Sequence, residues 1–154
     1  MSVYTALRSN DLPTAAKLQR LWAECVLSKL IDDIGGYPRV STEWKLMRYG
    51  AGAGQASRGV GLTVSEAAID RLQRNVDIAI WVESQLRDLG ALCFAISYLG
   101  YVQALNAEEI AERLQSEPKD IIDRRLDIAR NLNRRVKHVI REAETAEISW
   151  RLTA

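Results

Sequence analysis

The residues from Asn106 to Arg141 constrain the fold of this chain more than any other stretch. They read NAEEIAERL, then QSEP, then KDIIDRRLDIARNLNRRVKHVIR. Asn106 is a good helix N-cap, and Glu109 three residues later can return its hydrogen bond as a capping box. Pro118 suits the first position of a second helix, where no N–H is needed, and Ser116 can cap that helix. The pattern predicts a short helix, a tight turn and a long helix.

The long second helix has an apolar face and a basic face. Between Arg124 and Arg141 there are seven basic side chains and one acid, Asp127, although the net charge of the whole chain is only +1. Such a strip suits phosphates, and helix-turn-helix proteins set a second helix of this kind against DNA. A solvated helix surface is the open alternative. The apolar face is Ile121, Ile128, Leu132, Val136 and Val139, interrupted by Arg125, and the basic face is Arg130, Arg134, Lys137 and Arg141.

The sequence pattern in the first part of the chain predicts another helix, over residues 12–34. Asp11 or Leu12 lies in its cap region, with Pro13 in the first turn. Apolar residues then recur at helical spacing as far as Ile34, and the paired glycines at 35 and 36 end the pattern.

The middle of the chain adds helices and one loop. Residues 50–62 contain a glycine-rich loop, and a capping-box signature from Thr63 to Glu66 starts a second long helix over 64–89. The next stretch, ALCFAISYL, is apolar on nearly all sides, so it is expected to be the central helix and to end at Gly100. No strand is predicted. The expected fold is a compact all-α domain spanning 1–154, with the helix-turn-helix of 106–141 at its C-terminal end.

Composition excludes several classes of protein. The near-neutral charge excludes a wholly basic protein. Cys25 and Cys93 are expected to be free thiols in a reducing cytoplasm, and no apolar run is long enough for a signal peptide or a membrane span. His138 is the single histidine, and its expected place is the surface or opposite a phosphate. No spacing predicts a metal site, a cofactor loop or a catalytic triad, so we expect no enzyme and no cofactor.

A second basic surplus spans the segment before the glycine-rich loop and the loop itself, where four cations face only Glu43. Trp44 and Tyr49 lie among them, and cations with aromatics can contact nucleic acid or an RNA polymerase surface. In the favoured alternative, the two aromatic side chains cover the hydrophobic core. The four cations are Arg39, Lys45, Arg48 and Arg58.

Between Leu18 and Val139 the layout resembles the Q antitermination proteins of lambdoid and related phages. The similar segments are LQRLWAECV, the turn and basic-aromatic segment GGYPRVSTEWKLMRYG, the acidic helix start SEAAIDRLQ, the motif EIAERL, and the arginine-rich RRLDIARNL. The EIA-x-x-L portion is similar also to region 4 of primary sigma factors. The resemblance implies a late-gene regulator that binds double-stranded DNA, engages RNA polymerase holding its sigma factor, and lets it read through terminators.

The resemblance also implies which residues contact DNA. The helix-turn-helix helices fall on 107–114 and 119–126, and four residues approach base edges or phosphates: Lys119, Asp120, Asp123 and Arg124. Arg125 and Arg130 lie at the flank, and Arg134 and Lys137 extend the basic face. Gln115 stands where such turns usually carry glycine, so it requires a left-handed backbone or a shifted turn. Acidic side chains at the start of the second helix can accept a hydrogen bond from the amino group of cytosine, but they repel phosphate.

Two other functions stay open at this stage. A helical module that binds a partner protein, without nucleic acid, would use the same surface. A small phage packaging subunit is a weaker alternative, because such subunits carry the helix-turn-helix near the N-terminus. The sequence does not determine the oligomeric state.

Overall fold

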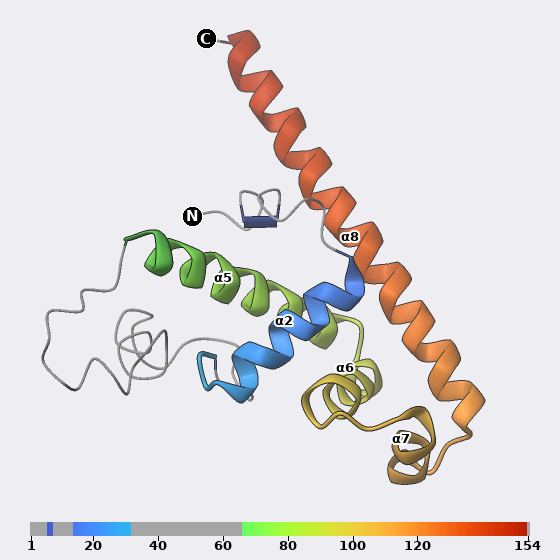
Figure 1. Ribbon diagram of the computed structural model, residues 1–154. Helices are drawn as coiled ribbons and strands as arrows, with labels where there is room; N and C mark the ends of the chain where they lie inside the picture. Colours follow the sequence, from blue (N-terminus) through green and yellow to red (C-terminus); the bar gives the residue numbers. More distant parts are fainter. Residues whose placement is uncertain (1–5, 8–13, 32–65, 154) are drawn as a thin grey trace, which may run out of the picture.

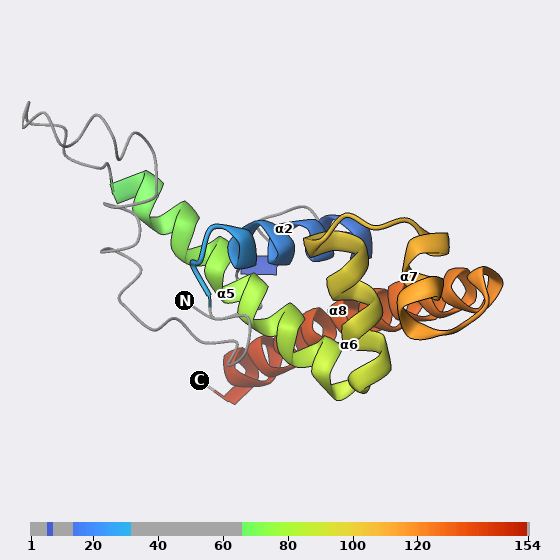
Figure 2. The same ribbon diagram turned by 90° about the horizontal axis from the view of Figure 1, so that it is seen from below.

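The computed structural model describes residues 6–7, 14–31 and 66–153, and helices are the only regular structure in these segments (Figure 1). The predicted all-α class is therefore confirmed for the described chain. Figure 1 shows the last helix running along the body and continuing past it at the C-terminal end, and Figure 2 shows the same helices from below. The helices are α2 (Ala15–Leu27), α5 (Glu66–Asp88), α6 (Ala91–Ser97), the π-helix η1 (Tyr98–Val102), α7 (Ala107–Leu114) and α8 (Pro118–Thr153).

Helix α2 is the most enclosed helix of the described chain, and Trp22 is its main anchor. The Trp22 side chain is 0% exposed and meets the rings of Phe94 and Tyr98 edge-on, with ring centroids 5.7 and 6.4 Å away. Its indole Nε1 donates to Oε1 of buried Glu83 at 3.3 Å. The prediction that the ALCFAISYL helix is central is wrong, because Leu92 of α6 is 41% exposed.

A buried polar contact joins α2 to α6 inside this core. The hydroxyl of Ser97 donates to Oε1 of Gln19 at 2.9 Å, and Nε2 of Gln19 donates to the Ala15 carbonyl at 3.3 Å. Both side chains are buried. Because buried polar groups are costly without partners, this pairing fixes how α6 is placed on α2.

Helix α2 is shorter than the predicted 12–34 at both ends. Thr14 is its N-cap, with Oγ1 accepting from the Lys17 N–H, so the cap is neither Asp11 nor Leu12. Lys29 has a left-handed backbone with φ 56°, and the Leu30 N–H bonds back to the Cys25 carbonyl at 2.9 Å. The apolar spacing continued past Leu27 because Leu30 and Ile31 fold back onto the core.

Gly100 does not end a helix, contrary to the prediction, because α6 passes into η1, which runs through it. A Cβ at this position would lie 3.3 Å from Cζ of Arg125 on α8. The glycine therefore allows a close approach between the two helices. Helix α5 lies within the predicted 64–89 helix, whereas the 50–62 loop and Thr63 are outside the described residues.

Candidate nucleic-acid interface

Helix α7 begins and ends as its sequence predicts. Oδ1 of Asn106 accepts from the Glu109 N–H at 2.9 Å, and Oε1 of Glu109 accepts from the Asn106 N–H at 3.3 Å, completing the capping box. Gln115 has the left-handed backbone that the missing glycine requires, with φ 54° and ψ 47°. The Ser116 N–H then donates to the Ala111 carbonyl at 2.9 Å, so this carbonyl in the last turn of α7 has a hydrogen-bond partner.

Replacing Gln115 with glycine is expected to stabilise the protein. A left-handed backbone strains a residue that has a Cβ, and glycine removes this strain at some cost in chain entropy. We expect Gln115→Gly to raise the free energy of unfolding by about 0.5–1 kcal/mol. Urea denaturation measures this change. Gln103→Gly, at a position with φ −93°, is the control and is expected to give no gain.

Helix α8 starts at Pro118 and continues to Thr153, twelve residues beyond the predicted Arg141. Ser116 does not cap it, because the Ser116 hydroxyl donates back to the Leu114 carbonyl at 3.4 Å. The Glu117 carbonyl accepts the first helical bond, from the Ile121 N–H. The inner face of α8 is buried as expected, through Ile121, Ile128, Leu132 and Val136, with Val139 partly buried.

Arg125, one of the predicted DNA-binding residues, packs within the protein. Its guanidinium lies 5.3 Å from the centroid of the Tyr101 ring and against Gly100. Its side chain is only partly exposed. The position of Arg125 inside the apolar face of α8 was the sequence signal for this inward role.

Substitution of Arg125 should therefore affect stability more than affinity for a polyanion. A cation over an aromatic ring and the packing of the long side chain contribute about 1–2 kcal/mol at a partly buried site. We expect Arg125→Ala to lower the free energy of unfolding by about that amount. Thermal denaturation tests this, with Arg124→Ala, an exposed neighbour, as the control. Equal Tm values for the two variants would contradict the inward role.

Arg135 also serves the fold. Its NH1 donates at 2.7 Å to Oδ2 of Asp88 and at 2.7 Å to Oε1 of Gln85, both on α5. The side chain is 27% exposed. This contact ties the middle of α8 to the end of α5, so one of the seven predicted basic side chains is taken up by an intramolecular ion pair.

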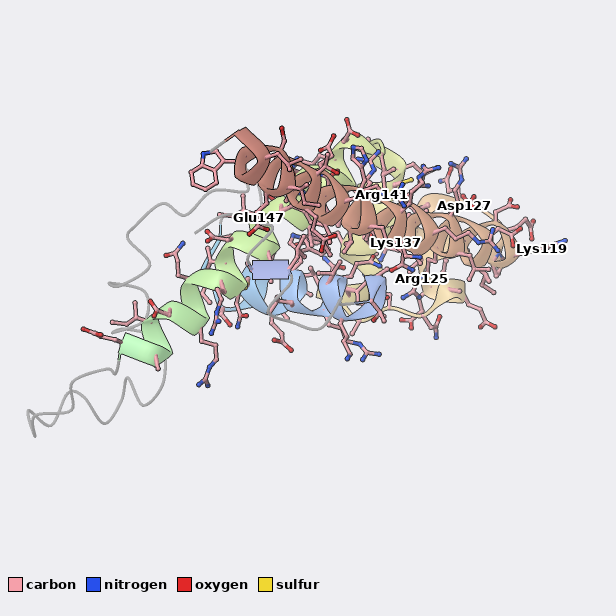
Figure 3. The ribbon with its side chains drawn as sticks, turned by 90° about the horizontal axis from the view of Figure 1, so that it is seen from above. Lys119, Arg125, Asp127, Lys137, Arg141 and Glu147 are labelled. Atoms are coloured by element: carbon pink, nitrogen blue, oxygen red, sulfur yellow. The ribbon has the colours of Figure 1, made fainter. Side chains whose placement is uncertain are left out.

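Five of the seven basic residues remain: Arg124 near the beginning of α8, and four farther along the helix, all of them exposed. NH1 of Arg130 lies 3.7 Å from Oδ1 of Asp127, and both side chains are largely in solvent. NH2 of Arg134 donates a hydrogen bond to Oδ1 of Asn131. Within the described residues Lys137 and Arg141 form no ion pair, and Figure 3 shows both on α8 beyond Asp127. Exposed ion pairs contribute little to stability, so these contacts leave the four cations available to bind an anion.

A hollow of about 410 Å³ lies along this basic stripe. This hollow is lined by the four exposed cations, Arg130, Arg134, Lys137 and Arg141. Two further residues complete it, Asn133 and His138. Sequence reasoning missed Asn133, because an isolated amide on a helix carries no signal. His138 is on the surface, with Nε2 3.0 Å from Oε1 of Glu142.

The beginning of α8 has a different character. Lys119 is exposed at this end of the helix (Figure 3). A second hollow, of about 350 Å³, lies between α6 and α8, with Leu92 and Ile96 on the α6 side. Its lining on α8 includes Asp120, Asp123, Arg124 and Asp127. Three acids against one cation make this end unfavourable for phosphates, while the stripe that starts at Arg130 is favourable.

The second predicted contact set, Arg39, Lys45, Arg48 and Arg58, lies outside the described residues. Over the segments that the structure describes, no group of three histidine, cysteine or carboxylate residues is arranged to hold a metal ion. No helix in those segments is long and apolar enough to span a membrane.

Comparison of the chain with protein-family models, curated proteins and solved structures gave no match. The fold and the site define a helical protein with a short capped helix, a left-handed turn and a long helix bearing an exposed cationic hollow.

Proposed function

We propose that this protein is a DNA-binding transcription regulator, and that α7 and α8 act as its helix-turn-helix. The observation that carries the proposal is the exposed basic stripe on α8, the helix that follows the capped α7 and the left-handed turn at Gln115. Arg130 to Arg141 spans about 16 Å at 1.5 Å per residue. This length is comparable with the width of the DNA major groove, about 12 Å, so the stripe can contact phosphates at its edge.

The proposed contacts divide into two kinds. The middle of α8 would bind phosphates, which position a protein on DNA without reading its sequence. Lys119, Asp120, Asp123 and Arg124 at the beginning of α8 would approach the bases, where a carboxylate can accept from the amino group of cytosine. The acids there limit phosphate contact, so sequence preference would depend on few residues.

The resemblance to the phage Q proteins supplies the proposed activity. The protein would engage RNA polymerase and its sigma factor near a late promoter and allow the polymerase to read through terminators. Leu92, which is 41% exposed on the α6 side of the acid-lined hollow, supports a protein contact beside the DNA contact. No catalysis and no cofactor form part of the proposal.

A protein-interaction module without nucleic-acid binding is the second candidate. The half-exposed Leu92 beside three aspartates favours it, because apolar side chains within a charged rim are typical of protein contacts. In this case the basic stripe would be a solvated helix face.

Binding to duplex DNA over a range of salt concentrations distinguishes the two candidates. We expect log K to fall linearly with log salt, with a slope of about −0.9 for each neutralised phosphate, hence about −4 for four cations. Transcription across a terminator, with and without the protein, then tests antitermination. Absence of duplex binding at low salt would contradict the DNA-binding proposal, and unchanged termination would contradict the proposed activity.

A further inference from the structure

The side chain of Asn133 has a fixed orientation that the proposed DNA binding does not require. Its Oδ1 accepts from the backbone N–H of Ala15, the first residue of α2, at 3.0 Å. A backbone N–H can only donate, so the amide atom facing it must be the oxygen. The Nδ2 group is therefore directed away from Ala15, and the hydrogen bonds within the described chain leave it without an acceptor.

Asn133 lies among cations at the hollow on α8. The hollow is lined by this amide, by His138 and by four basic side chains, and no carboxylate of the described residues is part of its lining. Two acids of α8 contact the lining from outside: Oδ1 of Asp127 lies 3.7 Å from NH1 of Arg130, and Oε1 of Glu142 lies 3.0 Å from Nε2 of His138. An anion entering the hollow would meet a positive field and a neutral donor of fixed direction.

We propose that this hollow binds one phosphodiester group of the nucleic-acid backbone, with the Nδ2 group of Asn133 donating to a phosphate oxygen. The inference rests on the proposed DNA binding and specifies where one phosphate is held. Asn133 is oriented in advance by α2, so little side-chain freedom is lost when the phosphate binds. The flexible cations supply charge, and the amide supplies position.

Asn133→Asp tests the inference without removing the contact to α2. An aspartate keeps an oxygen for the Ala15 N–H, and negative charge is favourable at a helix N-terminus, so we expect an unchanged or higher Tm. The same change replaces the donor in the hollow with an anion. Affinity for a mixed-sequence DNA duplex should fall by about ten-fold or more, since a lost bond and an added repulsion each weaken binding.

Gln103→Glu is the matched control. It makes the same change from a neutral amide to a carboxylate at an exposed position, the C-cap of η1, and Gln103 does not line the hollow. We expect it to weaken duplex binding several-fold less than Asn133→Asp. Equal losses in the two variants would mean that the stripe attracts DNA only through a diffuse field, and would overturn the inference while leaving DNA binding intact.

The wild-type protein provides a test that does not depend on a variant. Titration with the duplex should shift the NMR signals of the Asn133 side-chain NH2 more than those of the Gln103 side-chain NH2, and an unshifted Asn133 signal would overturn the inference. Inorganic phosphate is the second probe and should cause a smaller shift of the same signals. If phosphate shifts them and the duplex does not bind, the hollow is an anion site and the proposed DNA binding fails.

Discussion

Replacing Lys137 and Arg141 with glutamate is expected to reduce duplex affinity on the order of a hundred-fold at moderate salt. Each charge-assisted hydrogen bond contributes about 1.5–3 kcal/mol, and the introduced carboxylates add repulsion. Both residues are exposed, line the hollow and form no ion pair within the described chain, so the fold should be kept. The slope of log K against log salt should become less steep by about two units, one for each lost phosphate contact. Fluorescence anisotropy at several salt concentrations measures both quantities.

The double variant Arg20→Glu and Arg71→Glu is the control for net charge. It changes the charge of the protein by the same amount from exposed positions on α2 and α5, away from the basic stripe of α8. We expect less than a three-fold loss of affinity at 0.15 M salt, where screening acts over about 8 Å. A similar loss in both double variants would show that total charge, and not the α8 surface, controls binding.

Replacing Trp22 with alanine is expected to have the largest effect on stability. The ring is completely buried between α5 and α6, against Phe94 and Tyr98, and its Nε1 donates to Glu83. Large-to-small changes of buried aromatics cost about 3–5 kcal/mol, because apolar contacts are lost and a cavity is left. For a protein of this size the Tm should fall by roughly 6–20 °C, at about 2–4 °C for each kcal/mol. Thermal and urea denaturation followed by circular dichroism measure the change.

Two further variants separate the causes of this loss. Trp22→Phe keeps most of the ring packing and removes the donor to Glu83, so it should cost about 1–3 kcal/mol. Leu152→Ala, at a position 82% exposed near the end of α8, should change stability by less than about 0.5 kcal/mol. If Trp22→Ala cost no more than Leu152→Ala, the assignment of Trp22 as the anchor of the core would be wrong.

The sequence correctly predicted the features that depend only on residues close together in the chain. The capping box at Asn106, the proline at the start of α8 and the apolar face from Ile121 to Val136 depend on neighbours along one helix. The sequence also indicated a left-handed backbone at Gln115, because helix-turn-helix turns usually carry glycine at this position. Lys29 and Ala104 have the same left-handed backbone, with φ 56° and 54°, but no local pattern indicated them.

The surface of α8 shows where sequence reasoning reached its limit. Seven basic side chains between Arg124 and Arg141 were assigned to one strip, yet Arg125 packs on Tyr101 and Arg135 pairs with Asp88. These partners come from η1 and α5, so helical spacing alone could not separate exposed cations from internal ones. The role of Asn133 was equally hidden, since it depends on the N-terminus of α2, 118 residues earlier in the chain.

The sequence by itself determined the helical class, the break between α7 and α8 and the positive charge of α8, because capping, periodicity and charge act over short distances along the chain. Only the tertiary structure decided which cations face solvent, that Trp22 is buried against Phe94 and Tyr98, and that Asn133 bonds the N-terminus of α2 while lining a basic hollow. The physical reason is that burial and hydrogen bonding are set by whichever residues the fold brings into contact, and these contacts join positions that are far apart in the sequence.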